Sequence, residues 1–274
     1  MLSIITSIHN QLGMNQLFYE KLCAYTTQPF ELIIIDNAST DGSREFFRQQ
    51  AHVQVVGHEG NYNYPYCQNR GIEVAKYDIL CFLNNDLIVS PGWDRHIYQY
   101  FGAHPQSEVI SVATNDHVES KMAQRKLHRR WKRIKYTTQF LAGNRKHALA
   151  WMHHWMYGDW KQFTQERFQQ WQYQTLEGYS GSAIIMQRRA LAKIGMWDER
   201  IQAADFDLFN RVKERALTEG DIQPIQLLLG IYFHHYQRLT MKSDYPPFQN
   251  KDQMIRLDEK WGRKTEGLRK DIIG

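Results

Sequence analysis

Short apolar runs alternate with helix-like stretches over the first 115 residues. Residues 32–35 form a continuous apolar run, which is typical of a strand buried on both faces of a sheet. Four more strand-like segments keep the same rhythm: 3–8, 53–56, 79–83 and 109–114. Helical spacing fills the intervals between them. The alternation predicts an α/β fold, in which a mostly parallel sheet is flanked by helices on both faces.

This rhythm stops at residue 116 and resumes near residue 179. Residues 116–178 are basic, aromatic and helical in pattern, and a polar tail occupies residues 246–274. We therefore expect one α/β domain, built from residues 1–115 and 179–245, with a helical insertion between its two halves.

In open parallel sheets, ligands bind beyond the carboxyl ends of the strands. That rule selects Ser7, Asp36, Gly57 and the cluster at 84–86. Asp36 is an acid at the tip of a buried strand, where it could form a hydrogen bond to a base or a ribose.

The segment LCFLNNDL, residues 80–87, ends a buried strand in two amides and a carboxylate. Asn84 and Asp86 point the same way if the extended conformation persists. Such oxygen ligands suit Mg²⁺ or Mn²⁺, which need few protein ligands when a diphosphate supplies the others. The alternative is a strand followed by an Asn/Asp turn.

Seven segments, taken in order, resemble glycosyltransferase family 2 and its GT-A fold. They are SIITSIHN, ELIIIDNASTDGS, GNYNYPYCQNRGI, DILCFLNNDLIVSPGW, GYSGSAIIMQRRALAKIGMWDERI, ADFDLFNR and HHYQRLT. The resemblance covers residues 1–115 and 178–240. It implies that residues 1–115 bind a nucleotide-sugar and that residues 179–245 bind the acceptor and carry the catalytic base.

The activity implied is an inverting transfer of a sugar from a nucleotide diphosphate-sugar to a hydroxyl of a glycan or glycolipid, as in polysaccharide biosynthesis. UDP is the favoured nucleotide, and dTDP is its rival because similar LNNDL motifs occur in rhamnosyltransferase-like relatives. The cofactor implied is Mn²⁺ or Mg²⁺.

The resemblance also assigns the residues that contact the nucleotide. These are Ser7, Asp36, Asn61, Asn63, Asn84 and Asn85. Asn69 matches the same Asn-rich segment, with a helix-packing role as its alternative.

The metal is assigned to Asp86 and His235, with His234 as the rival histidine. Asn84 stands where the family has the first acid of its Asp-X-Asp motif, which leaves Asp86 as the sole carboxylate ligand.

The catalytic base implied is Asp205, although the Glu that commonly precedes it is Ala204 here. A carboxylate at a helix start is kept ionised by the helix dipole and can accept a proton from an acceptor hydroxyl. The alternative is a first-turn acid that only stabilises the helix. Trp197 and Asp198 fall in the segment that lies under the acceptor, and Trp197 could equally belong to the core.

The net charge of +5 is concentrated in residues 121–135, which hold eight Lys or Arg and no acid. Ala123, Leu127, Trp131 and Ile134 recur at helical spacing within this segment, so it reads as an amphipathic basic helix. Three roles stay open for it. It could lie on an anionic membrane, where a lipid-linked saccharide would be the acceptor, bind an anionic acceptor directly, or pack its apolar stripe against the main domain.

The chain has no apolar run long enough to span a membrane and no signal-peptide pattern. Its three cysteines, Cys23, Cys67 and Cys81, fit small core positions in a reducing cytoplasm. We expect a cytoplasmic protein, with peripheral contact at the inner face of the membrane as a variant. Nucleic acid is not expected as a partner, because acidic strand tips repel phosphates. A nucleic-acid binder acting through the basic segment and a non-catalytic nucleotide-sugar binder are the alternative functions.

Overall fold

The computed structural model describes residues 1–237, 246–262, 264 and 268 of the 274-residue chain. Within them nine strands form one sheet, in the order β3-β2-β1-β4-β8-β6-β9-β5, with β7 paired to β9. The strands are β1 Leu2–Ile8, β2 Phe30–Asn37, β3 Val53–His58, β4 Ile79–Leu83, β5 Leu87–Ile88, β6 Val109–Thr114, β7 Thr175–Glu177, β8 Ala183–Gln187 and β9 Gln226–His235.

The strand directions confirm the predicted mixed, mostly parallel sheet. β1 to β4 run parallel, β8 is antiparallel to both β4 and β6, and β9 is parallel to β6. The short strands β5 and β7 pair antiparallel with β9. These two strands are only two and three residues long, which is too short for a periodic sequence pattern to predict them.

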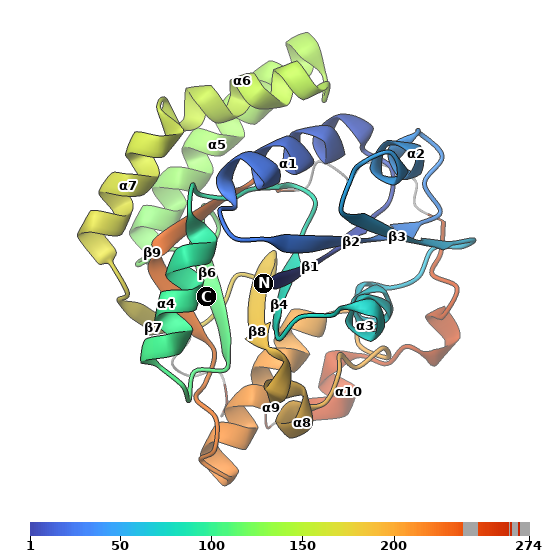
Figure 1. The fold of residues 1–274 in the computed structure, drawn as a ribbon, viewed down its shortest axis with the longest axis vertical. Coiled ribbons are helices and arrows are strands. Elements are labelled where there is room, and N and C mark those ends of the chain that lie inside the picture. Colours follow the sequence, from blue (N-terminus) through green and yellow to red (C-terminus); the bar gives the residue numbers. More distant parts are fainter. Residues whose placement is uncertain (238–245, 263, 265–267, 269–274) are drawn as a thin grey trace.

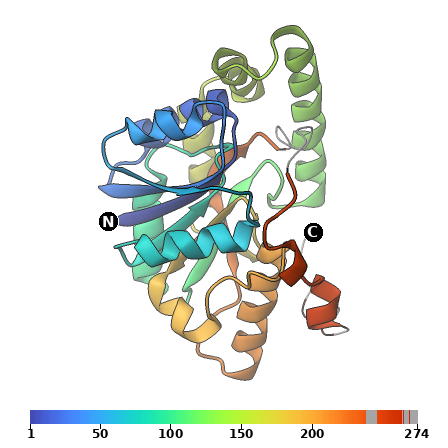
Figure 2. The ribbon, with the colours of Figure 1, turned by 90° about the vertical axis from the view of Figure 1, so that its right-hand side faces the viewer.

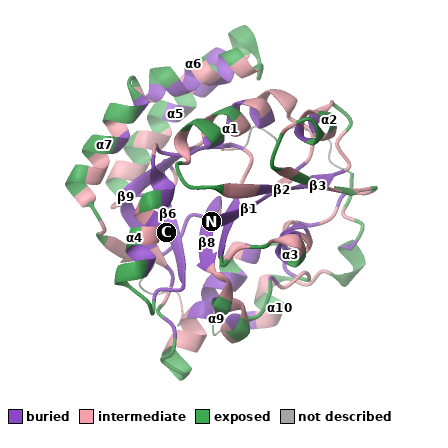
Figure 3. Cartoon of the chain, in the orientation of Figure 1, coloured by how far each residue is buried: buried purple, intermediate pink, exposed green. Residues whose placement is uncertain are grey.

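Helices cover both faces of the sheet (Figure 1). They are α1 Leu12–Tyr25, α2 Ser43–Arg48, α3 Tyr64–Val74, α4 Trp93–Ala103, α5 Lys121–Ala142, α6 Lys146–Tyr157, α7 Trp160–Trp171, α8 Leu191–Ile194, α9 Ala204–Thr218 and α10 Leu257–Trp261, with short 3₁₀ turns at Arg188–Ala190 and Lys251–Gln253. One core cluster packs the helices α1, α4, α5, α6 and α7 against the sheet. The other packs α3, α8 and α9 against it. Figure 3 shows the central strands buried between these layers.

The insertion forms α5, α6 and α7, which pack onto one side of the main domain (Figures 1 and 2). Trp131 of α5 is 1% exposed, and Leu127 and Ile134 pack partly buried against the main core. The apolar stripe therefore faces the domain, as the third of the three predicted roles requires. None of the helices in the described part of the chain is long and apolar enough to cross a bilayer.

The segment expected to be a polar tail packs on the α/β domain as far as it is described. Trp261 is buried and its indole N–H donates to Asp207 at 2.8 Å, while Lys260 forms ion pairs with Asp198 and Asp207 at 2.7 Å. Among the cysteines, Cys67 and Cys81 are buried as predicted, but Cys23 is exposed. That prediction was wrong because Cys23 lies on the outer side of α1, beside the buried Leu22.

Candidate active site

The carboxyl ends of neighbouring strands bring the first selected residues together. Pairing of β1 with β2 places Ser7 opposite Ile35 and Ile8 opposite Asp36, and pairing of β2 with β3 places Asp36 opposite Gly57. β4 ends at Leu83, immediately before the 84–86 cluster. The strand tips thus share one edge of the sheet, as the parallel topology requires.

A cleft of about 390 Å³ opens at this edge. It is lined by Tyr64, Asn84, Asp116, His117, Ser180, Gly181, Ser182, Gln202, Ala204, Asp205 and His235. Three of the residues predicted for the site, Asn84, Asp205 and His235, are therefore brought together. They come from the end of β4, the start of α9 and the end of β9, so distant parts of the sequence form one pocket.

The imidazole of His235 lies between two carboxylates. Its Nε2 is 3.2 Å from Asp86 Oδ1, and its Nδ1 pairs with Asp116. The backbone of His235 is held by Asn115, whose side chain both accepts from its N–H at 2.7 Å and donates to its carbonyl at 2.9 Å. Burial alone would lower the pKa of His235, but the charges of Asp86 and Asp116 outweigh it and raise that pKa well above 6.5.

The adjacent His234 points into the core instead. It is fully buried among aromatic rings, including Trp131 and Tyr236, and its Nδ1 is 3.0 Å from the hydroxyl of Tyr157. Burial, reinforced by the neighbouring histidines, lowers its pKa well below 6.5. Because successive side chains of a strand point to opposite faces, only His235 reaches the cleft.

Asp205 is the second residue of α9, in the first turn of the helix. Its Oδ1 accepts from the N–H of Phe206 at 3.0 Å. A Cβ at Gly181 would lie 2.1 Å from Asp205 Oδ2, so the carboxylate occupies the space that any larger residue at 181 would fill. Ala204 lies beside it in the cleft wall, at the position where the family commonly has a second acid.

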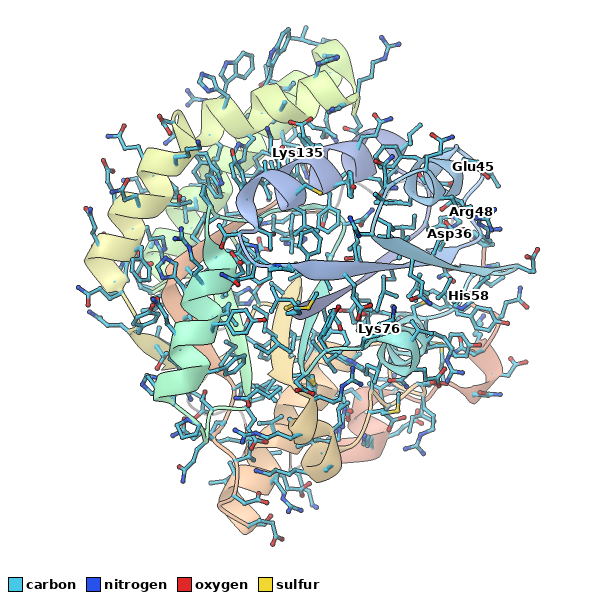
Figure 4. The ribbon with its side chains drawn as sticks, in the orientation of Figure 1. Asp36, Glu45, Arg48, His58, Lys76 and Lys135 are labelled. Atoms are coloured by element: carbon cyan, nitrogen blue, oxygen red, sulfur yellow. The ribbon has the colours of Figure 1, made fainter. Side chains whose placement is uncertain are left out.

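Asp36 is fully buried and forms an ion pair with Arg44, which also donates to the carbonyl of His58 at 2.7 Å. Its other oxygen, Oδ1, has no hydrogen-bond partner among the described residues. Ser7 is half-buried, and its hydroxyl accepts from Gln68 at 3.4 Å. Figure 4 places Asp36 and His58 at the β2–β3 side of the sheet, apart from Lys135 of α5.

The predicted nucleotide contacts Asn61, Asn63 and Asn85 all make hydrogen bonds within the protein. Asn61 accepts from Asn37 at 2.8 Å and donates to the carbonyl of Pro246 at 2.6 Å. Asn63 caps α3 by accepting from the Tyr66 N–H at 3.2 Å, and it donates to the carbonyl of Glu199 at 2.6 Å.

Asn85 donates to Asn15 of α1 at 2.7 Å. Residues 85–86 form a turn, so the extended conformation ends before them. Asn84 and Asp86 nevertheless both face the cleft side, because Asp86 pairs with the cleft residue His235. Asn69 has the packing role: its side chain bonds the backbone N–H and carbonyl of Trp197 at 3.0 and 2.9 Å.

Neither predicted acceptor residue lines the cleft. Trp197 is 4% exposed and packs edge-on against Tyr64 and Phe82, which is the core alternative. Asp198 forms ion pairs with Arg200 at 2.8 Å and Lys260 at 2.7 Å. Its bond to Arg200, with help from Lys260, lowers the pKa of Asp198 below its usual range.

Six polar residues of the cleft were not among those predicted from the sequence: Tyr64, Asp116, His117, Ser180, Ser182 and Gln202. Asp116 follows the tip of β6 just as Asp36 and Asp86 lie at the ends of their strands, so the strand-tip rule would have found it. It was overlooked because the basic insertion begins there. Tyr64 opens α3, and its buried hydroxyl has no hydrogen-bond partner within the described part of the chain.

The donor set near Asp86 fits a divalent cation that keeps most of its ligands from substrate and water. Asp86 Oδ1 is buried and has no hydrogen-bond partner among the described residues, and Nε2 of His235 lies 3.2 Å from it. In residues 1–237, 246–262, 264 and 268, no group of three or more His, Cys, Asp or Glu is arranged to hold a metal alone. One carboxylate and one histidine are enough when a diphosphate completes the coordination.

The model of the family described as glycosyl transferase family 2 matches residues 3–195. The chain belongs to this family. The matched region includes β1 to β8 and the insertion helices, and it ends before Asp205.

Two curated relatives support the family over a shorter stretch. Glycosyltransferase GlyG of Streptococcus pneumoniae is 29% identical over 103 residues, 36% of this chain and 34% of the relative. The uncharacterized glycosyltransferase YibD of Escherichia coli is 34% identical over 94 residues, 33% of this chain and 27% of the relative. The match thus spans about a third of the length of these relatives.

Solved structures show the same GT-A fold. The mannosyltransferase PcManGT from Pyrobaculum calidifontis, in complex with GDP-Man and Mn²⁺, matches with a TM-score of 0.52 and 14% identity, over 89% of this chain and 58% of that one. TarS 1-349 of S. aureus, in complex with UDP, matches with a TM-score of 0.53 and 14% identity, over 85% of this chain and 60% of that one. At this identity the likeness concerns the fold.

Proposed function

We propose that this protein transfers a sugar from a nucleotide diphosphate-sugar to a hydroxyl group of a glycan or glycolipid acceptor, with inversion at the anomeric carbon. The observation that carries the proposal is the convergence of Asp205, Asn84 and His235 on one cleft, next to Asp86. Membership of glycosyl transferase family 2 supports the reaction class.

Asp205 is the proposed general base. As the acceptor hydroxyl attacks the anomeric carbon, its proton passes to the carboxylate of Asp205. The new carbon–oxygen bond forms on the face opposite the breaking bond to the diphosphate, so a single displacement inverts the configuration. Asp205 lies in the first turn of α9, where the positive end of the helix dipole favours a negative charge.

Asp86 and His235 are the proposed ligands of a divalent cation, Mn²⁺ or Mg²⁺. When bound, the cation would neutralise the charge that develops on the departing diphosphate. Asp116 accepts from Nδ1 of His235 and thereby directs Nε2 toward Asp86. This carboxylate–histidine arrangement is the usual way in which proteins orient a metal-ligating imidazole.

The nucleotide is proposed to lie along the tips of β1 and β2, beside Ser7 and Asp36, with Asn84 facing the diphosphate or the sugar. UDP is the favoured nucleotide, with support from the UDP complex of the TarS structure. GDP and dTDP sugars are the alternatives to be tested. Asn61, Asn63 and Asn85 reach the nucleotide only if they exchange a hydrogen bond described above, so we assign them to the support of the site.

A thermal-shift screen of UDP, GDP and dTDP and their sugars, each with Mn²⁺ and with EDTA, tests this proposal. A ligand present at 100 times its dissociation constant raises stability by about 2.7 kcal/mol, which is readily seen as a higher melting temperature. We expect one nucleotide class to stabilise the protein only with metal, and Asp86→Ala to remove that effect. Stabilisation that is equal with EDTA would refute the metal site, and donor binding without release of nucleoside diphosphate to any acceptor would indicate a non-catalytic binder.

A further inference from the structure

The outer sides of α5 and α6 form a surface that the proposed chemistry does not use. Arg129, Arg130 and Arg133 of α5 line a surface hollow of about 600 Å³ together with Ile134 and Trp155. Arg130 also donates to the backbone carbonyl of Trp155 at 3.1 Å, which links the two helices. We call Arg129, Arg130, Arg133, Trp151 and Trp155 the basic–aromatic face.

The charge of this region is not balanced within the protein. Residues 121–157 hold ten Lys or Arg and no Asp or Glu. Eight of these cations are exposed and form no ion pair with any described residue: Lys121, Arg125, Lys126, Arg129, Arg130, Lys132, Arg133 and Arg145. An external polyanion is the natural counterpart of such a surface.

Large apolar side chains are exposed among these cations. Trp151 is 60% exposed and Trp155 is 52% exposed, and their i, i+4 spacing puts both on one side of α6. At the end of α5, Phe140 is 90% exposed and Leu141 is 73% exposed. Exposed tryptophans beside cations are characteristic of surfaces that lie at a membrane–water interface, where the ring has an apolar body and a polar N–H.

The inner side of α5 fixes this surface relative to the cleft. The indole of Trp131 donates to the carbonyl of Tyr236 at 3.2 Å, and Lys135 donates to the carbonyl of Gln237 at 3.1 Å. Both acceptors directly follow His235, which lines the cleft. In Figure 2, α5 is the upright green helix at the right-hand edge, on the side of the molecule opposite the N-terminus.

We propose that the basic–aromatic face binds the surface of a bilayer that contains anionic lipids. The arginines contact lipid phosphates, while Trp151 and Trp155 enter the interfacial layer. A bilayer accounts for the exposed aliphatic and aromatic groups such as Phe140 and Leu141, which the phosphate backbone of a nucleic acid would leave in water. This inference does not depend on the donor chemistry, because none of these residues lines the cleft.

Co-sedimentation of the full chain with phosphatidylcholine vesicles, with and without phosphatidylglycerol, tests the proposal. We expect binding only to the anionic vesicles, and weaker binding as NaCl is raised. Each basic side chain near an anionic surface contributes on the order of fivefold in partitioning, so the triple variant Arg129→Gln, Arg130→Gln, Arg133→Gln should bind about 100-fold more weakly.

The matched control neutralises three exposed cations elsewhere: Arg48→Gln, Lys76→Gln, Lys251→Gln. Arg48 and Lys76 are labelled in Figure 4, away from α5. This variant should retain wild-type binding. Equal loss in the control and the arginine variant would overturn the proposal, because net charge rather than this face would then explain adsorption.

A second measurement locates the tryptophans. Lipids brominated in the acyl chain should quench part of the tryptophan fluorescence of the bound protein, and Trp151→Phe, Trp155→Phe should remove that quenching while most binding persists. Unchanged quenching would refute the assigned face. Binding of RNA or DNA at physiological salt, in preference to anionic vesicles, would likewise overturn the lipid assignment.

Discussion

Polar side chains gather in two places along the carboxyl edge of the sheet, and their hydrogen bonding differs. Beside β2 and α3, the side chains of Asn61 and Asn63 each donate one hydrogen bond and accept another within the protein. At the ends of β4, β9 and the start of α9, Asn84, Asp205 and His235 face an open cleft. The first group holds the scaffold, and the second group is placed where a substrate can reach it.

The difference shows how polar residues in one motif can have separate tasks. A buried amide costs free energy unless it is hydrogen-bonded, so the Asn-rich loop before α3 is stable because its amides pair internally. The residues Asn84, Asp205 and His235 line an open cleft, where a ligand can reach them. Substitutions should therefore affect stability in the first group and turnover or metal binding in the second.

The largest effect is expected for Asp205→Asn. This isosteric change keeps an oxygen that can accept from the Phe206 N–H but removes the base, so kcat should fall by about 10²- to 10⁴-fold with donor affinity unchanged. Release of nucleoside diphosphate measures kcat, and thermal shift measures donor binding. Asp221→Asn, which changes an exposed acid paired with Arg215, is the control and should be fully active. Near-normal turnover in Asp205→Asn would make Asp205 a helix-start acid only.

The next largest loss of turnover is expected for Gly181→Ala. Its Cβ would lie 2.1 Å from Asp205 Oδ2, so the carboxylate must move, and displacement of a catalytic group by about 1 Å can cost about 10²-fold in rate. The melting temperature should change little, because the atoms within 3 Å of the added Cβ, Oδ2 and Cγ, belong to the side chain of Asp205 and not to the backbone. Gly102→Ala in α4 is the matched control, since no atom lies within 4 Å of its added Cβ. Full activity of Gly181→Ala would contradict the assigned position of the base.

Asp116→Asn tests whether the proposed metal ligand His235 depends on the carboxylate that orients it. Loss of the carboxylate that orients His235 should weaken Mn²⁺ affinity by about 10- to 100-fold, as is usual for residues that position a ligand. Titration calorimetry of Mn²⁺ in the presence of UDP measures this without relying on turnover. An unchanged affinity would show that His235 needs no such support or does not bind the metal.

The smallest effect is expected for Asn63→Ala, and it should appear in stability. Removal of the cap of α3 should lower the free energy of unfolding by about 1 kcal/mol, measured by urea denaturation, with donor affinity retained. Asn63→Ser keeps a capping oxygen and should recover much of that loss. If Asn63→Ala abolished donor binding at unchanged stability, the amide would belong with the cleft residues after all.

The sequence by itself determined the sheet, its ligand edge and the family. Runs such as residues 32–35 are typical of strands buried on both faces, and the parallel connections place their polar ends at one edge. Asp36 and Asp86 could be selected in this way because each lies at the end of a strand, which is a local feature, whereas Asp205 was assigned from the resemblance to the family. The apolar stripe of residues 121–135 was equally local, since helical periodicity defines which side packs.

Only the tertiary structure decided which of these polar groups the cleft contains. Whether Trp197 stacks on a sugar or packs in the core depends on Tyr64 and Phe82, which are far from it in sequence. His234 and His235 are separated by the alternation of a strand that pairs with elements over a hundred residues away. The ion pairs of His235 with Asp86 and Asp116 join three strand ends, and no local pattern encodes such a meeting because it follows from the order of strands in the sheet.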